Sequence, residues 1–265
     1  MDNDNQLKQP ALSGFAPVNG ISMYYEIHGN GSPLVLIHGG GSTIQTSFGY
    51  ALPLLSERFK IIAVELQAHG HSSDRDAPES FEQDADDVAA LLAHLSIEKA
   101  DILGFSNGGS TAMQIAVRHP NVVNKLVLLS ALYKRDGLIN GFFDGLQNAT
   151  LDDMPALLKT SYLKANNDNV GLKTMFEKDR QRMLDFKDWS DETLQSIKAP
   201  AFLIVADKDV ITIEHTSKMA QLISNSQLMV VPGVHGSYIN EICVANYNNK
   251  IPAMTLAVIE EFLNG

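Results

Sequence analysis

Three side chains of this sequence could form an activated nucleophile, although they lie far apart along the chain. Ser106 lies in Gly-Phe-Ser-Asn-Gly (104–108), after an apolar run and before a stretch of small residues that resembles a helix. A serine on a sharp strand-to-helix turn is typical of a nucleophile, because the turn exposes the hydroxyl. The hydroxyl also needs a base within hydrogen-bond reach and a carboxylate that orients this base.

Two later apolar runs supply a candidate acid and a candidate base. His235 follows the run 226–233, and Asp209 follows the run 200–207. Open α/β sheets place their sites beyond the carboxyl ends of their strands, so the three side chains are expected to meet there. Asp207 is the alternative acid. We favour Asp209 because the acid must reach the histidine from beyond the strand, and Asp207 would then shape the turn.

A glycine-rich loop could supply the donors for an oxyanion. The segment Ile-His-Gly-Gly-Gly-Ser-Thr (37–43) follows a third apolar run. Acyl transfer needs two backbone N–H groups aimed at the developing negative charge, and we assign these to Gly40 and Asn107. His38 is expected to hold the loop by hydrogen bonds. His69 and His71 suggest a metal site, but a polar loop is favoured because no cysteine or carboxylate completes a ligand set.

The apolar runs and helical patterns between them predict a fold. Runs of β-rich residues predict strands at 21–29, 33–39, 59–66, 100–106, 125–131, 200–207 and 226–233. Helical patterns separate them at 80–95, 108–120, 212–223 and 250–264. This alternation predicts an α/β protein with a mostly parallel sheet of about eight strands and helices on both faces. The turn residues 30–32 predict a hairpin between the first two strands, and the first dozen residues are expected to form a loose tail.

One stretch interrupts the alternation. Residues 134–198 contain no convincing strand and show helical patterns at 151–165, 170–188 and 190–197. We predict a core of 1–133 and 199–265 with 134–198 as a helical cap, because lids are drawn from such insertions. An extra helical layer that packs on itself is compatible with the same pattern. The pocket beneath is expected to include Phe105, Phe142, Phe143, Met175 and Met183.

Composition limits the classes of partner. The 265 residues carry a net charge of −11, which argues against a nucleic-acid partner because phosphates require a basic surface. The polar start of the chain does not resemble a signal peptide, and no apolar run approaches the roughly 18 residues that span a bilayer. We expect a cytoplasmic protein with no membrane partner, no metal and no cofactor. Its oligomeric state is not predicted.

Together these motifs resemble the α/β-hydrolase-fold serine hydrolases of the capped, single-domain, esterase- or lactonase-like kind. The matched features run from about residue 20 to the C-terminus and include the HGG loop, the AHGHS loop, GFSNGGS and PGVHG. The resemblance implies Ser106 as nucleophile, His235 as base and Asp209 as acid, with the N–H groups of Gly40 and Asn107 as the oxyanion hole.

Two departures from the family pattern are visible. The loop at 65–71 lacks the usual Asp and Gly-x-Gly, and Asn107 stands where relatives often carry Met, Gln or Leu. The serine nucleophile favours acyl chemistry, so the expected substrate is a small carboxylic ester or lactone. Hydrolysis of C–C bonds, acyl or peroxyacid transfer, and non-catalytic binding of a small molecule in the capped pocket remain alternatives.

Overall fold

The computed structural model describes residues 10–265 and contains one eight-stranded sheet in the order β1-β2-β4-β3-β5-β6-β7-β8. β1 pairs with β2 and β2 with β4 in antiparallel fashion, and the other neighbours are parallel. The prediction of a mostly parallel sheet of about eight strands is confirmed. The strands are β1 (Leu12–Val18), β2 (Ile21–His28), β3 (Ser32–Ile37), β4 (Phe59–Val64), β5 (Ala100–Phe105), β6 (Val123–Leu129), β7 (Ala201–Lys208) and β8 (Ser226–Val234).

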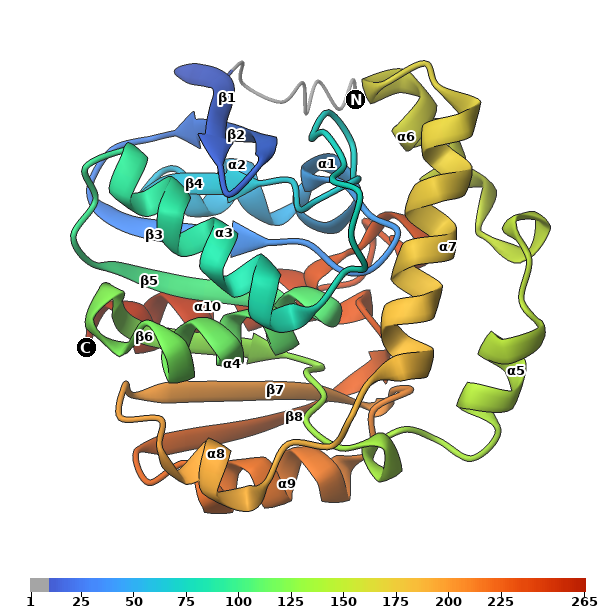
Figure 1. Cartoon of the computed structure of the whole chain (residues 1–265). Coiled ribbons are helices and arrows are strands. Elements are labelled where there is room, and N and C mark those ends of the chain that lie inside the picture. The colour runs from blue at the N-terminus through green and yellow to red at the C-terminus, as the bar shows by residue number, and fades with distance from the viewer. Residues whose placement is uncertain (1–9) are drawn as a thin grey trace.

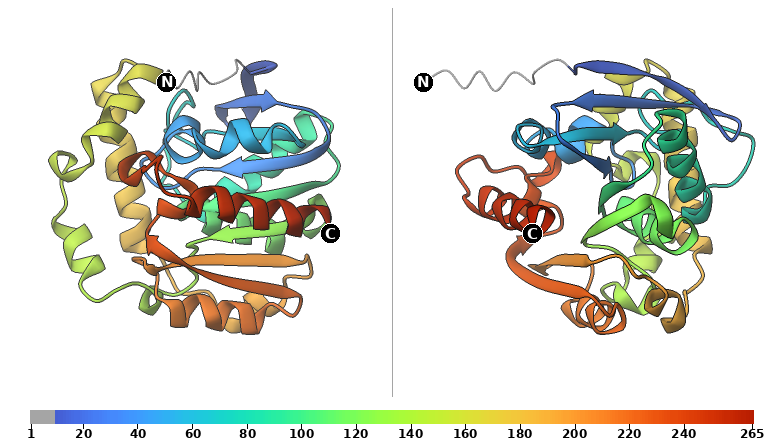
Figure 2. Two further views of the ribbon diagram at one scale, coloured as in Figure 1. Left: turned by 180° about the vertical axis from the view of Figure 1, so that it is seen from behind. Right: turned by 90° about the vertical axis from the view of Figure 1, so that its left-hand side faces the viewer.

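Helices cover both faces of the sheet (Figure 2). Apolar residues alternate along a central strand such as β3, where Val35 and Ile37 face one helical layer while Leu34 and Leu36 face the other. One layer comprises α3 (Phe81–His94), α4 (Asn107–Arg118), α8 (Asp191–Gln195) and α9 (Ile213–Leu222). The other comprises α1 (Ile44–Phe48), α2 (Ala51–Leu55) and α10 (Ile251–Asn264). Because both faces are covered, the central strands are apolar throughout.

Local sequence determines where these helices begin. The Ser80 hydroxyl accepts a hydrogen bond of 3.1 Å from the Gln83 N–H at the start of α3, and acidic residues occupy its first turn. This cap satisfies one of the N–H groups that lack a partner at the start of a helix, and the acidic residues complement the helix dipole. Val88, Leu91 and Leu92 form the buried stripe of α3.

One expectation about the N-terminal region is wrong, and another lies mostly outside the described residues. The loose tail was expected over the first dozen residues, of which 1–9 are not described, and Leu12 already begins strand β1. β2 pairs with β1 and with β4, and β4 separates it from β3, so residues 30–32 do not close a hairpin. The hairpin lies one connection earlier, at Asn19-Gly20, both of which adopt positive φ.

Residues 1–9, on which most of the expectation about a signal peptide rests, lie outside the described residues. Within 10–265, no helix has both the length and the apolar character needed to cross a membrane.

Between β6 and β7 the chain forms α5 (Phe142–Asn148), α6 (Ala156–Ala165), α7 (Asn169–Asp185) and then α8. The sequence patterns did not predict α5. Figure 1 shows α7 standing across the ends of the parallel strands, with α5 and α6 beyond it. The C-terminal part of α7 packs on the core through Met183, and Phe186 follows in the same apolar cluster with Val205 of β7 and Ile211. This segment therefore faces the edge of the sheet where β5, β7 and β8 end.

The turn between β5 and α4 depends on two glycines. A Cβ at Gly104 would collide with the backbone carbonyl of Gly108, and a Cβ at Gly108 would collide with the carbonyl of Ile37. Backbone atoms cannot swing away as the end of a side chain can. The close approach of β5, β3 and α4 therefore requires residues without side chains here.

We predict that Gly104→Ala lowers the free energy of unfolding by about 1–3 kcal/mol or more, because the added methyl group overpacks a backbone contact. Gly145 in α5 is the matched control, since a Cβ there meets nothing within 4 Å. Gly145→Ala should leave stability unchanged or raise it by about 0.5–1 kcal/mol through helix propensity. Chemical denaturation of both variants provides the measurement, and equal effects would contradict the packing argument.

Candidate active site

Ser106 occupies a strained position between β5 and α4. Its backbone has φ 55° and ψ −122°, a conformation that residues with side chains rarely adopt. The surrounding structure holds it there, because the Ser106 N–H donates to the Leu129 carbonyl of β6 at 2.8 Å. The turn leaves Ser106 partly exposed while the strand before it is buried. The hydroxyl is thus presented at the carboxyl end of the sheet.

Ser106, His235 and Asp209 form one chain of hydrogen bonds. The Nε2 atom of His235 lies 3.1 Å from the Ser106 Oγ, and its Nδ1 lies 2.6 Å from Oδ1 of Asp209. A carboxylate can only accept, so Nδ1 carries the proton and the lone pair of Nε2 faces the serine. Asp209 follows β7 and His235 follows β8. The structure therefore brings the three predicted residues together in the arrangement that activates a serine.

The Asp209 carboxylate is buried and well supplied with donors. Its Oδ2 accepts from the Ser130 hydroxyl at 2.6 Å, and Oδ1 accepts from the Ile211 N–H at 3.2 Å. Burial raises the pKa of Asp209, but the hydrogen bonds from His235, Ser130 and the Ile211 backbone outweigh it and hold the pKa below its usual value. The carboxylate is therefore ionised at neutral pH. The alternative acid, Asp207, is exposed and accepts from the Gly233 N–H at 2.7 Å, so it shapes the adjoining backbone.

Ser130 and Tyr238 extend this network, and sequence reasoning missed both. Ser130 has a positive φ of 48° at the end of β6, and its Oγ lies 2.5 Å from the Tyr238 hydroxyl, which is buried. A serine directly after the apolar run 125–129 was the available signal, because it marks a strand end at the same edge of the sheet.

The two predicted oxyanion donors lie beside Ser106. Asn107 is the first residue of α4, so its N–H has no acceptor inside the helix. The Gly40 N–H has no protein acceptor within residues 10–265. His38 holds the loop, because its ring accepts from the Leu66 N–H at 3.1 Å and its other nitrogen lies 2.8 Å from the Gly39 carbonyl. Burial lowers the pKa of His38 to about 3, so its ring is neutral.

His69 and His71 take structural positions. Nδ1 of His69 lies 2.8 Å from the Gln67 carbonyl, and Nε2 accepts from the Gly41 N–H at 3.3 Å. His71 lies 2.9 Å from the Glu65 carboxylate. Both nitrogens of His69 are thus used to shape the loops. Among the described residues, no three His, Cys, Asp or Glu side chains gather as a metal site would require.

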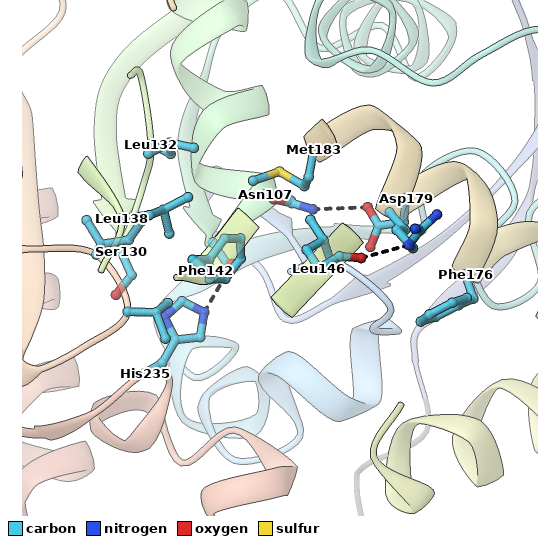
Figure 3. A pocket seen from close by; sticks show the side chains of 15 residues that line it. Asn107, Ser130, Leu132, Leu138, Phe142, Leu146, Phe176, Asp179, Met183 and His235 are labelled. Carbon is cyan, nitrogen blue, oxygen red and sulfur yellow. Dashed lines mark hydrogen bonds between the residues drawn. The ribbon is translucent and has the colours of Figure 1, made fainter. Parts of the chain in front are cut away.

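A cavity of about 310 Å³ opens above Ser106 and His235 (Figure 3). Its walls are mostly apolar and include Leu132, Leu138, Phe142, Leu146, Phe176, Met183, Val210 and Ile211. Its polar lining is formed by Gly40, Ser106, Asn107, Ser130, Asp179, Arg180 and His235. An apolar enclosure with a few convergent polar groups is the usual form of a small-molecule site.

Of the five predicted pocket residues, Phe142 and Met183 line this cavity and three do not. Phe105 is buried beneath the His235 ring, with 4.8 Å between ring centroids. Phe143 turns to Phe142 and to the guanidinium of Arg135. Met175 is fully buried among side chains of α6 and α7. The apolar residues of a helix include its own packing face, and composition does not separate this face from a pocket face.

A buried charge cluster adjoins the cavity, and sequence reasoning missed it. The Asn107 side chain points to Asp179 of α7, and its Nδ2 donates to Oδ1 at 3.0 Å (Figure 3). Asp179 pairs with Arg182 one turn later on α7, and Arg182 bonds Asp84 of α3 at 2.6 Å. In the sequence, Asp179 and Arg182 have the spacing of an ordinary solvent-exposed helical ion pair, so nothing marked them.

The carboxylates of this cluster differ in charge. Burial raises the pKa of Asp84 to about 7 although Arg182 opposes the shift, and burial also raises the pKa of Glu79. Burial acts on Asp179 in the same direction, but the charge of Arg182 and the hydrogen bonds from Arg182 and the Asn107 amide outweigh it and lower the pKa of Asp179. Of the three carboxylates, Asp179 is thus the one whose charge Arg182 chiefly balances. The result is an ionised carboxylate, backed by a guanidinium, in the wall of the cavity.

We predict that Asp84 makes stability fall as pH rises. The folded protein holds the Asp84 proton more tightly than the unfolded chain, with a pKa of about 7 against an ordinary value of 3.8. Deprotonation across this window therefore costs stability. Relative to wild type, Asp84→Asn should become progressively more stable between pH 4 and 7, as measured by denaturation at each pH.

Asp86 on the same helix is the control, because hydrogen bonds from Arg118 lower its pKa. The free energy of unfolding of Asp86→Asn should not increase relative to that of the wild type as pH rises. If the free energy of unfolding of Asp84→Asn differed from that of the wild type by the same amount at every pH, Asp84 would be ionised throughout this range.

Comparison with known proteins shows similarity to α/β hydrolases. A sequence model described as alpha/beta hydrolase fold matches residues 32–162. Serine hydrolase BPHL of Homo sapiens is 38% identical over 120 residues, which cover 43% of this chain and 41% of that protein. The AB hydrolase superfamily protein YisY of Bacillus subtilis is 35% identical over 163 residues, covering 60% of this chain and 59% of that protein. The chain thus aligns with only about half of each relative's length.

Among solved structures, the meta-cleavage product hydrolase from Pseudomonas fluorescens IP01 is similar over nearly the whole chain. The TM-score is 0.78 at 22% identity, and the match covers 96% of this chain and 98% of that one. At this identity the likeness shows the fold.

Proposed function

We propose that this chain, which has the α/β-hydrolase fold, is a serine hydrolase that cleaves a small carboxylic ester or lactone through an acyl-enzyme. The main support is the unbroken hydrogen-bond chain from the Ser106 hydroxyl through His235 to the buried Asp209 carboxylate. These three hydrogen-bonded residues would supply a nucleophile, a neutral imidazole base in the required tautomer, and a negative charge that stabilises the imidazolium formed on proton transfer.

The first half of the reaction forms a bond to Ser106. Its Oγ attacks the carbonyl carbon while His235 Nε2 takes the hydroxyl proton. The carbonyl oxygen becomes an oxyanion, which the N–H groups of Gly40 and Asn107 would bind. Collapse of this intermediate breaks the bond to the alcohol oxygen, and His235 returns the proton to that oxygen. The alcohol leaves, or stays attached as a hydroxyl if the substrate is a lactone.

The second half releases the acid. A water molecule gives its proton to His235 and attacks the acyl carbon, and the second tetrahedral intermediate uses the same two N–H donors. When it collapses, the bond to the Ser106 Oγ breaks and the proton returns from His235 to the serine. Asp209 stays ionised throughout and fixes the imidazole. These residues complete the cycle without any cofactor.

The cavity supports a small substrate and a capping role for residues 134–198. A volume of about 310 Å³ lies at the lower end of the range for small-molecule sites. Phe142, Leu146, Phe176 and Met183 from α5 and α7 form its outer wall. The helices between β6 and β7 would thus cover the acyl group and limit the access of water.

We predict that a fluorophosphonate probe labels the wild type at Ser106, because the neutral imidazole activates this hydroxyl. Ser106→Ala should not label and should lose ester hydrolysis, with labelling read by intact mass. Ser110 lies one turn further along α4, and its hydroxyl donates to the Leu132 carbonyl, so Ser110→Ala should still label. Resistance of the wild type to the probe would instead favour a protein that binds a small molecule without catalysis.

A second prediction compares the two aspartates that follow β7. Asp209→Asn should reduce kcat by a factor on the order of 10⁴, because an amide no longer fixes the tautomer of His235. Asp207→Asn should change kcat by less than about threefold, since Asp207 bonds the Gly233 backbone and not His235. Steady-state kinetics on one p-nitrophenyl ester measures both. Similar losses in the two variants would remove the basis for assigning Asp209 as the acid.

A further inference from the structure

One oxygen of the Asp179 carboxylate receives no hydrogen bond from the part of the chain that the structure describes. Its Oδ1 accepts from the Asn107 amide and from Arg182. No donor within hydrogen-bond distance reaches Oδ2 from residues 10–265. His69 Nε2 lies 3.9 Å away and already accepts from the Gly41 N–H, so it has no proton to offer. Because Asp179 lines the cavity, this acceptor is available to a molecule bound there.

The position of Oδ2 relates it to the proposed reaction. A Cβ built on Gly40 would lie 2.5 Å from Asp179 Oδ2 and 2.5 Å from the Asn107 amide nitrogen. The carboxylate therefore lies against the loop whose N–H is the proposed oxyanion donor. Asn107, the other proposed donor, is held by the same carboxylate through its side chain. A substituent next to the scissile carbonyl would come within reach of Oδ2.

The other charged group of the lining is used elsewhere. The Arg180 guanidinium donates to the carbonyls of Leu146 and Gln147 at the end of α5. Arg182 lies behind Asp179 and is buried, with its three carboxylate neighbours on α3, α7 and the loop before α3. Asp179 is thus the charged acceptor that faces the cavity.

We propose that Asp179 determines substrate specificity by accepting, at Oδ2, a hydrogen bond from a hydroxyl or ammonium group on the carbon next to the scissile carbonyl. This inference rests on the proposed serine hydrolase function and narrows its substrates to 2-hydroxy or 2-amino esters. Both classes share the same chemistry, a donor group on the carbon that is bonded to the carbonyl carbon.

Electrostatics favours substrates that carry this donor. A carboxylate close to a developing oxyanion opposes the accumulation of negative charge, and the water-poor cavity strengthens this repulsion. Arg182 offsets part of it from behind. A donor that bonds Oδ2 satisfies the exposed acceptor and shields the oxyanion from it. A substrate with a methyl group at this position would leave the acceptor desolvated and unpaired.

The test uses three ethyl esters of matched shape: 2-hydroxypropanoate, 2-aminopropanoate and 2-methylpropanoate. In the wild type, we expect kcat/KM for the hydroxy or the amino ester to exceed that for the methyl ester by about ten- to a hundredfold, as suits a hydrogen bond to a charged group. A preference for the amino ester that fades as pH rises through the titration of its amine identifies the ammonium. A pH-independent preference for the hydroxy ester identifies the hydroxyl.

The variant Asp179→Asn keeps the shape and removes the charge. It should reduce the ratio of kcat/KM between the donor-bearing ester and the methyl ester to within about threefold, because the amide lacks the charge that strengthens the hydrogen bond. Asp185→Asn, an exposed position on the same helix, should keep the wild-type preference.

Two outcomes overturn the inference, and they are distinguishable from failure of the proposed function. Equal rates on the three esters in the wild type, with Ser106 labelled by the fluorophosphonate probe, refute the role of Asp179 alone, whether or not the variant folds. A preference for the hydroxy or amino ester that remains at the wild-type level in Asp179→Asn also refutes the role of Asp179 alone. Absence of both labelling and hydrolysis in the wild type refutes the serine hydrolase and this inference together.

Discussion

The close approach of β5 and α4 at Gly104 and Gly108 is the contact on which the site depends. It forces the chain through a turn so sharp that Ser106 adopts a positive φ. The same geometry starts α4 at Asn107, whose N–H has no acceptor inside the helix and lies next to the serine. The proposed nucleophile and one proposed oxyanion donor thus depend on one packing constraint. The parallel sheet then adds Asp209 and His235, because the ends of β7 and β8 lie on the same edge.

Charge around the site is balanced on two sides. Asp209 keeps its charge because His235, Ser130 and backbone donors surround it. Asp179 keeps its charge because Arg182 and the Asn107 amide donate hydrogen bonds to it. The two carboxylates are held by different elements of the fold, one behind the His235 imidazole and one beside the loop at Gly40. Ser106 thus lies between a carboxylate that binds His235 and a carboxylate in the wall of the cavity.

The sequence was most informative where local pattern and topology act together. Apolar runs located the strands of the parallel sheet, and the residues just beyond 105, 207 and 233 contained Ser106, Asp209 and His235. Pairing partners were harder to predict, because the turn residues 30–32 suit a hairpin while β4, thirty residues later, takes the place beside β2. Asp179 could not be found, since its burial depends on how α7 lies on α3, and no local pattern encodes that contact. Met175 shows the converse, an apolar residue whose partners lie in α6 and not in the cavity.

The burial of Arg182 limits how the protein can admit a molecule. Lifting α7 from the core would separate a guanidinium from Asp84, and a charged group that loses its partner in a buried setting costs about 3–5 kcal/mol. No residue of α5 is fully buried, and α5 meets α7 through partly buried apolar side chains and through hydrogen bonds from Arg180 to carbonyl groups at the C-terminus of α5. Any opening that leaves the Arg182 cluster intact would therefore displace Phe142 and Leu146 of α5 from the cavity wall and leave α7 in place.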